Sequence, residues 1–202
     1  MNTFLDIGTG PGYFLDAVSV YLPDMGEKTF GIEKYPPVTE KRTKSSHYFV
    51  GDIKSFPNKV DCGLCMEVIE HITPLMFADL LKQLAGVSNE GALYLFNSGQ
   101  PEFVKNEDPN YLDPIRRGHI VSYSPESVSI IAEPLGYKVH RLRGKKWALA
   151  IEFKPPPALD DKDKNIQDRI WYPLRQNVDL LTDFAGGSTF KSLGLESARA
   201  YG

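Results

Sequence analysis

Residues 5–12 read Leu5-Asp6-Ile7-Gly8-Thr9-Gly10-Pro11-Gly12, which places three glycines within five positions after a short apolar run. Apolar side chains then recur every three or four positions from Phe14 to Leu22, a spacing that predicts a helix. Glycine lets a backbone turn sharply and lets a ligand approach it closely. The pattern therefore predicts a strand, a glycine-rich turn and a helix, with the turn open to a ligand.

Strands and helices are predicted to alternate along the rest of residues 1–154. Such alternation favours an α/β fold with a Rossmann-like, doubly wound and mostly parallel sheet. The last two strands are separated only by Arg143-Gly144-Lys145-Lys146, so we expect a C-terminal antiparallel hairpin at the end of a seven-stranded sheet. The further strands are predicted at 29–33, 48–50, 60–66, 91–96, 137–142 and 147–153, and the further helices at 73–86 and 124–135.

The run Pro155-Pro156-Pro157 marks a boundary between a domain at 1–154 and a tail at 155–202. Apolar residues recur every three or four positions in the tail and predict that it is partly helical, despite Pro173. Because an aligned apolar face is costly to leave in water, we expect the tail to pack on the domain, on a partner subunit or across a homodimer. These residues are Ile166, Ile170, Leu174, Val178 and Leu181.

Composition narrows the class of protein. The chain has 202 residues, 42% of them hydrophobic, with a net charge of −3 and a pI of about 5.8. This charge argues against a nucleic-acid partner, and no apolar run approaches the roughly 20 residues of a membrane span. No signal peptide is visible, so a soluble, cytoplasmic protein without a membrane partner is expected. Cys62 and Cys65 have CxxC spacing, but they fall within one predicted strand, so we expect them to point to opposite faces and to be buried.

A carboxylate follows the second predicted strand at Glu33, where it can accept hydrogen bonds from both hydroxyls of a ribose. The dinucleotide-binding pattern requires a third glycine at the position that Tyr13 occupies, so NAD is not the expected ligand. The glycine turn instead has the form G-x-G-x-G after an acidic residue. It resembles motif I of the class I S-adenosylmethionine-dependent methyltransferases.

Three later segments strengthen this resemblance, which covers about residues 3–153. They are Gly51-Asp52-Ile53, Met66-Glu67-Val68-Ile69-Glu70-His71-Ile72 and Gly118-His119-Ile120. The last two are similar to segments of the subgroup that contains ubiquinone-biosynthesis O-methyltransferases and many small-molecule and sugar methyltransferases. The resemblance implies that Asp52 meets the adenine amino group and that its neighbour packs on the ring. The implied S-adenosylmethionine-binding residues are Asp6, Gly8, Thr9, Gly10, Gly12, Tyr13, Glu33, Lys34, Asp52, Ile53 and Glu67.

The expected reaction is methyl transfer from S-adenosylmethionine to a small-molecule acceptor at oxygen, leaving S-adenosylhomocysteine. A hydroxyl acceptor must lose a proton, and imidazole titrates near neutrality, so His71 and His119 are the expected catalytic bases in a metal-free site.

Two alternatives remain open. The small-RNA 3′-end methyltransferases hold a divalent ion with a similar E-x-x-E-H run and a later histidine, which Glu67, Glu70, His71 and His119 match, so metal-assisted RNA 2′-O-methylation is one. A non-catalytic cofactor-binding or interaction subunit is the other. It is motivated by the short stretch before the first strand, where family members carry lid helices. We expect either that this lid is missing or that the tail at 158–202 or a partner subunit supplies it.

Overall fold

The computed structural model describes residues 2–155. The chain divides into two units, Met1–Pro157 and Ala158–Gly202. The predicted helical tail and its apolar residues lie outside the described residues, so its packing stays a prediction. Within residues 2–155, no helix is both long enough and apolar enough to cross a bilayer.

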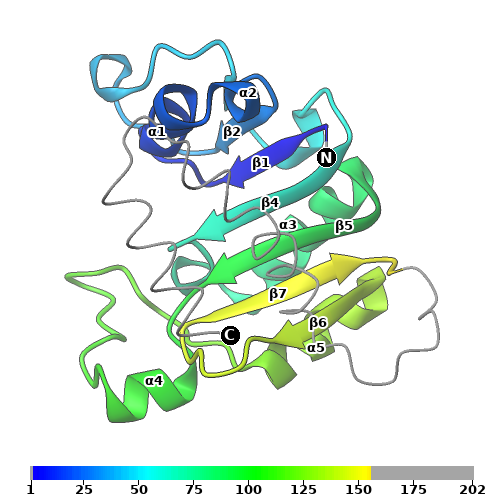
Figure 1. The fold of residues 1–202 in the computed structure, drawn as a ribbon. Helices are drawn as coiled ribbons and strands as arrows, with labels where there is room; N and C mark the ends of the chain where they lie inside the picture. Colours follow the sequence, from blue (N-terminus) through cyan, green and yellow to red (C-terminus); the bar gives the residue numbers. More distant parts are fainter. Residues whose placement is uncertain (1, 156–202) are drawn as a thin grey trace. The chain divides into compact units, whose positions relative to one another are not determined.

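A seven-stranded sheet in the order β3-β2-β1-β4-β5-β7-β6 forms the centre of the domain (Figure 1). Strands β1 to β5 pair in parallel, whereas β7 runs antiparallel to both β5 and β6. The predicted doubly wound sheet and its C-terminal hairpin are therefore confirmed. The strands are β1 Phe4–Ile7, β2 Thr29–Glu33, β3 Tyr48–Val50, β4 Val60–Met66, β5 Ser88–Asn97, β6 Tyr137–Arg141 and β7 Ala148–Phe153.

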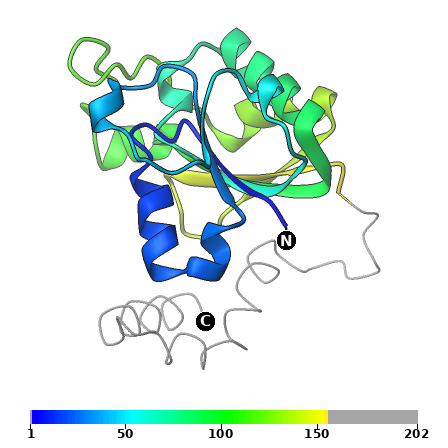
Figure 2. The same cartoon turned by 90° about the horizontal axis from the view of Figure 1, so that it is seen from above.

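Helices cover both faces of the sheet, with α1 and α2 on one face and α3 and α5 on the other (Figure 2). Thr73 and Ser124 cap α3 and α5, because each side chain accepts a hydrogen bond from an amide in the first turn. The helices are α1 Tyr13–Tyr21, α2 Pro23–Gly26, α3 Pro74–Val87, α4 Pro101–Asn106 and α5 Pro125–Ala132, and the 3-10 turns are η1 Thr39–Lys41, η2 Ile53–Ser55, η3 Ile69–His71 and η4 Glu133–Leu135.

The structure departs from the sequence prediction at two junctions. Helix α3 ends at Val87, one residue after the predicted end, and runs directly into β5, which begins at Ser88, three residues earlier than predicted. The polar segment after β5 is not a continuous loop, because it contains α4, which begins at Pro101. Proline favours the first turn of a helix, where its missing amide donor has no partner to lose.

The main core lies between the sheet and α3, where Leu5, Tyr94, Phe77 and Leu81 are fully buried. Cys65 joins this core, while Cys62 is half-buried and pairs in register with Phe4. Burial raises the pKa of both thiols, that of Cys62 to about 11, so both stay protonated near neutral pH. Burial was predicted for both cysteines and is confirmed for Cys65, whereas Cys62 is only half-buried.

The strand order reverses between β1 and β4, the two neighbours at the middle of the sheet. In open α/β sheets a crevice forms at such a point, outside the carboxyl ends of the strands. The glycine turn after β1 and the E-x-x-E-H run after β4 both begin at this edge. The topology therefore brings the two strongest sequence motifs together.

Candidate active site

The glycine turn uses its three glycines in two different ways. Gly8, Gly10 and Gly12 all have left-handed backbones, with φ of 72°, 56° and 86°. A Cβ at Gly8 would collide with Val68, and one at Gly12 would collide with Thr43, so these two glycines permit close packing. A Cβ at Gly10 would meet no protein atom within 4 Å, and Gly10 lines a cavity. Gly10 therefore keeps space free for something other than the protein.

Glu33, the last residue of β2, is fixed beside this turn. One carboxylate oxygen accepts the Gly10 amide at 2.9 Å, and the other accepts the Tyr35 amide at 2.9 Å. A carboxylate oxygen has more than one acceptor position, so each can still take a hydroxyl from a ligand. The side chain is thus held in one orientation before any ligand arrives.

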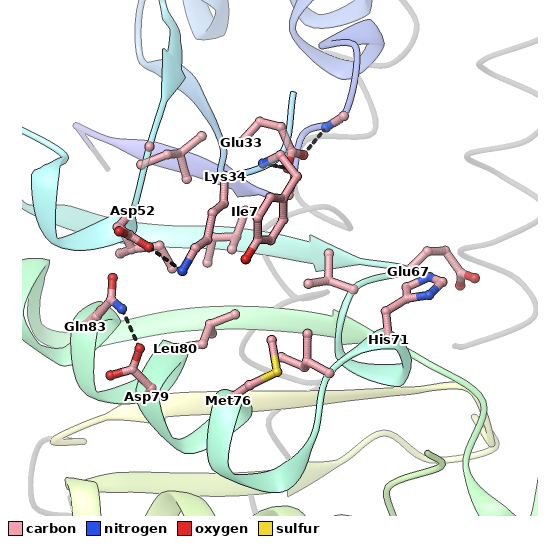
Figure 3. Close-up of a pocket in the computed structure, with 18 of the residues that line it drawn as sticks. Ile7, Glu33, Lys34, Asp52, Glu67, His71, Met76, Asp79, Leu80 and Gln83 are labelled. Atoms are coloured by element: carbon pink, nitrogen blue, oxygen red, sulfur yellow. Dashed lines mark hydrogen bonds and ion pairs between the residues drawn. The ribbon is translucent and has the colours of Figure 1, made fainter. Parts of the chain in front are cut away.

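The ends of β2 and β3 are linked by an ion pair between Lys34 Nζ and Asp52 Oδ1 at 2.7 Å (Figure 3). The ammonium group of Lys34 lowers the pKa of Asp52, and the hydrogen bond to Asp52 raises the pKa of Lys34. Next to Asp52, Ile53 is buried and lines the cavity. This wall of the cavity therefore offers a ligand the charged carboxylate of Asp52 and the apolar side chain of Ile53.

These elements enclose a cavity of about 710 Å³ at the carboxyl edge of the sheet. Its volume lies in the range of small-molecule sites. Of the sequence-predicted site residues, the lining includes Gly8, Gly10, Glu33, Lys34, Asp52, Ile53, Glu67 and His71. Lining residues that the sequence analysis did not single out as ligand-binding are Ile7, Ile32, Tyr35, Gly51, Val68, Ile72, Leu75, Met76, Asp79, Leu80 and Gln83.

The other predicted site residues lie behind the wall of the cavity. Asp6 is buried and accepts a hydrogen bond from the Thr9 hydroxyl at 2.7 Å, which braces the turn from inside. Burial raises the pKa of Asp6. Gly12 and Tyr13 begin α1, and the ring of Tyr13 is exposed. None of these four residues lines the cavity, and His119 also lies outside the lining.

Several of the missed lining residues share one origin, the first turns of α3. One face of this helix, which includes Phe77 and Leu81, lies in the core. Leu75 and Met76 sit on the other side of the same helix, where they are exposed and border the cavity. The signal available in the sequence was an apolar pair at the start of a predicted helix, shortly after the E-x-x-E-H run.

Glu67 lies at one end of the cavity beside His71 (Figure 3). Its backbone is left-handed with φ of 53°, which is unfavourable for a residue with a Cβ. Partial desolvation raises the pKa of Glu67, the nearby Glu70 carboxylate raises it further, and His119 and His71 lower it. Backbone strain of this kind gathers at functional sites, where the surrounding structure holds it.

Behind Glu67, one acidic side chain and two imidazoles converge. Glu70 is fully buried, and neither of its carboxylate oxygens has a hydrogen-bond partner among the described residues. His119 Nε2 lies 4.0 Å from Glu70 Oε1, and the rings of His71 and His119 meet edge to face at 4.8 Å. One ligand atom from each of the three side chains lies within 4.8 Å of the others. A buried carboxylate without a partner is rare and calls for a proton or a cation as its counterpart.

Both imidazoles are oriented by backbone carbonyls. His71 Nδ1 lies 3.1 Å from the Gly118 carbonyl oxygen, and His119 Nδ1 lies 2.9 Å from that of Tyr111. A carbonyl oxygen only accepts, so each Nδ1 carries the proton, and Nε2 of the neutral ring keeps its lone pair. In its neutral form, each histidine therefore presents a bare Nε2, the form that takes up a proton or binds a metal ion.

The sequence matches no family model and no curated protein. Solved methyltransferase structures do match the fold. Human N-acetylserotonin methyltransferase in complex with S-adenosylmethionine matches with a TM-score of 0.56 and 15% identity over 77% of this chain and 48% of its own. A S-adenosylmethionine-dependent methyltransferase from Archaeoglobus fulgidus matches with a TM-score of 0.54 and 20% identity over 91% and 80%.

An O-methyltransferase from neocarzinostatin biosynthesis, in complex with S-adenosylhomocysteine and 1,4-dihydroxy-2-naphthoic acid, matches with a TM-score of 0.57 and 15% identity. The chain spans about half the length of several of these structures, 48% and 49% in two of the three. At these identities the likeness establishes the fold, which is that of the class I methyltransferases. The resemblance read from the motifs is confirmed at this level.

Proposed function

We propose that the protein is an enzyme that binds S-adenosylmethionine in the cavity and transfers its methyl group to a small-molecule acceptor at oxygen. One observation carries the proposal. The cavity at the point of strand reversal is bounded at once by Gly10, Glu33 and Asp52 at one end and by Glu67 and His71 at the other. The first group suits a nucleoside and the second suits a reacting centre.

The nucleoside end of the cavity has a role for each wall. Glu33 accepts the two ribose hydroxyls with the oxygens that already hold the Gly10 and Tyr35 amides. Ile53 supplies an apolar surface for the adenine ring, and Asp52 accepts its amino group, with Lys34 keeping the carboxylate ionised. Gly10 leaves room for the ligand next to the backbone. These assignments follow the motif resemblance, and the described contacts are compatible with each of them.

When bound, the sulfonium group supplies an electrophilic methyl. The task of the protein is to hold an acceptor oxygen in line and to remove its proton, and positioning of this kind supplies much of an enzyme's acceleration. We assign the proton transfer to Nε2 of His71, which lines the cavity, and keep His119, whose ring packs against that of His71, as the second candidate base. The carbonyl oxygen of Gly118 keeps His71 in the tautomer that this step requires.

The acceptor at oxygen is supported by the names of two structural neighbours. The solved O-methyltransferases include mitomycin 7-O-methyltransferase and the neocarzinostatin-biosynthesis enzyme. Both names describe methyl transfer to oxygen. We propose an oxygen acceptor for this chain as well, without proposing a particular substrate.

Calorimetric titration with S-adenosylhomocysteine tests the cofactor site. We expect saturable binding, and at 100 times the dissociation constant a stabilisation of about 2.7 kcal/mol, seen as a higher melting temperature. NAD serves as the control ligand and should not bind, since Tyr13 stands where the dinucleotide pattern has its third glycine. Absence of S-adenosylhomocysteine binding to the folded protein would refute the proposal. Turnover with a panel of hydroxylated acceptors then separates an enzyme from a non-catalytic binding subunit.

A second candidate function, metal-assisted 2′-O-methylation of RNA, is favoured by one observation, the buried and unpartnered Glu70. The side chains that would hold a divalent ion are Glu67, Glu70, His71 and His119. Two carboxylates and two imidazoles suit a manganese-type ion, and each bare Nε2 is ready to ligate. A bound ion would supply Lewis-acid stabilisation of charge on the acceptor oxygen.

Manganese binding to the resting protein separates the two candidates without any need for an acceptor. In the metal-free scheme, neither Mn²⁺ nor a chelator changes the melting temperature, and the protein leaves the electron-spin-resonance signal of free Mn²⁺ unchanged. In the metal scheme, Mn²⁺ binds and stabilises the wild type, and Glu70→Gln loses most of that effect. Glu40→Gln is the matched control, because Glu40 is an exposed carboxylate on η1.

A further inference from the structure

We propose that Tyr111 is a positioning residue for His119. It forms hydrogen bonds at both ends of the segment between β5 and His119, and it thereby holds the neutral imidazole with its proton on Nδ1 and none on Nε2. The inference rests on the proposed function and deepens it. It applies equally to a proton-accepting and to a metal-binding His119, because both roles require the same lone pair. Tyr111 does not line the cavity, so it acts only through His119.

The phenol of Tyr111 fastens the start of the segment. Its hydroxyl oxygen accepts the Gly99 amide at 2.7 Å and lies 3.3 Å from the Ser98 hydroxyl, directly after β5. Burial raises the pKa of Tyr111, so the group stays a neutral phenol that can accept from the amide and donate to Ser98 at once. The ring is almost fully buried and packs edge to face on Phe103 of α4.

The other end of the same residue fastens the histidine. The Tyr111 carbonyl oxygen accepts the His119 Nδ1 proton at 2.9 Å, and its ring lies 4.5 Å from the imidazole, centroid to centroid. On the far side of His119 lies the buried carboxylate of Glu70. The imidazole therefore lies between Tyr111 and Glu70, with Nδ1 bonded to the Tyr111 carbonyl oxygen and Nε2 at 4.0 Å from Glu70 Oε1, too far for a hydrogen bond.

The close fit at Gly99 shows that the ring position is specified. A Cβ at Gly99 would lie 2.8 Å from the Tyr111 ring, closer than any ordinary contact, and its φ requires no glycine. Glycine is therefore required at position 99 because the Tyr111 ring is close, and its backbone conformation would accept any residue. A residue that only filled core volume would need neither this clearance nor the two hydrogen bonds at the phenol.

The tautomer of His119 in the free protein tests the inference directly. In ¹⁵N-histidine-labelled protein, the nitrogen shifts report which ring nitrogen carries the proton, and the signals missing from His119→Gln identify His119. We expect the Nδ1–H tautomer in the wild type. Tyr111→Phe keeps the ring and the backbone carbonyl but removes the hydroxyl, and with it the hydrogen bond to the Gly99 amide. The segment is then held less firmly, so the tautomer ratio of His119 should shift toward Nε2–H by up to about five-fold.

Tyr137→Phe is the matched control. Its hydroxyl is also buried and also hydrogen-bonded to the backbone, because it donates to the carbonyl oxygen of Leu81, but it lies on β6. We expect this variant to leave the His119 shifts unchanged. Gly99→Ala displaces the Tyr111 ring from the opposite side and should change the His119 tautomer as Tyr111→Phe does, so it decides the matter if Tyr111→Phe fails to fold.

Unchanged His119 shifts in folded Tyr111→Phe, or in folded Gly99→Ala if Tyr111→Phe fails to fold, would overturn the inference. An equal change in Tyr137→Phe would do the same. The proposed function fails by a different measurement, the absence of S-adenosylhomocysteine binding, so the two failures are distinguishable. In turnover assays, the same variants should lower kcat with little effect on the KM for S-adenosylmethionine, since Glu33 and Asp52 are untouched.

Discussion

The two ends of the cavity differ in how completely their polar groups are satisfied. At the nucleoside end, Glu33 holds two backbone amides and Asp52 holds Lys34. At the histidine end, Glu70 is buried with no hydrogen-bond partner among the described residues, and Glu67 has a strained backbone. The first end is complete without a ligand, whereas the second keeps unsatisfied groups that only function accounts for. Substitutions at the nucleoside end should therefore lower ligand affinity, whereas substitutions at the histidine end should raise stability.

The largest expected effect is at the glycine turn. Asparagine tolerates a left-handed backbone, but in Gly10→Asn its side chain projects into the cavity. Gly10→Asn should therefore abolish S-adenosylhomocysteine binding in calorimetry, with little change in melting temperature. Gly144→Asn is the matched control, because Gly144 is also left-handed with open space at its Cβ but lies in the β6–β7 turn. A Gly10→Asn protein that binds like the wild type would show that the ligand does not approach this turn.

Glu33→Ala should weaken S-adenosylhomocysteine binding by about 10- to 100-fold, because the ribose loses a charged acceptor. The Gly10 amide also loses its partner, so the glycine turn is held less firmly. Glu40→Ala removes an exposed carboxylate of the same type and should leave the affinity unchanged. Equal affinities of Glu33→Ala and the wild type would remove Glu33 from the site.

At the histidine end the expected effect is a gain in stability. Glu70→Met replaces a buried carboxylate that has no partner, so in metal-free buffer it should raise the free energy of unfolding by about 1–3 kcal/mol. Urea denaturation measures the difference, and Glu40→Met should show no comparable gain. A large loss of stability in Glu70→Met would mean that Glu70 is satisfied in solution and that the contrast between the two ends is wrong.

The smallest effect concerns pH. The pKa of Glu67 is raised in the folded protein, so the folded state binds more protons than the unfolded state across the window between the two pKa values. Stability from this group is therefore greatest below the window and falls as pH rises through it. Glu67→Gln should be slightly more stable than the wild type at neutral pH and lose that advantage in acid. An advantage that is constant from pH 4 to pH 7 would assign the gain to something other than ionisation.

The nucleoside end was largely predictable from the sequence, for a local reason. Gly10, Glu33 and Asp52 each lie within three residues of the end of a parallel strand, and parallel strands present their carboxyl ends at one edge. Once the strands were recognised, the cavity wall followed. Asp6 and Tyr13 were placed in the ligand site by the same motif, but their side chains point into the turn and into solvent, a distinction that spacing does not carry.

The sequence by itself determined the doubly wound fold, the place of the cavity and most of its nucleoside wall, because these depend on short strands and the residues that follow them. Only the tertiary structure decided that Glu70 is buried without a partner, that His119 reaches it, and that Tyr111 holds the histidine. These contacts join residues across the loop after β5, and the path of such a loop is set by packing against the rest of the fold. The spacing of apolar residues in the sequence does not predict that packing.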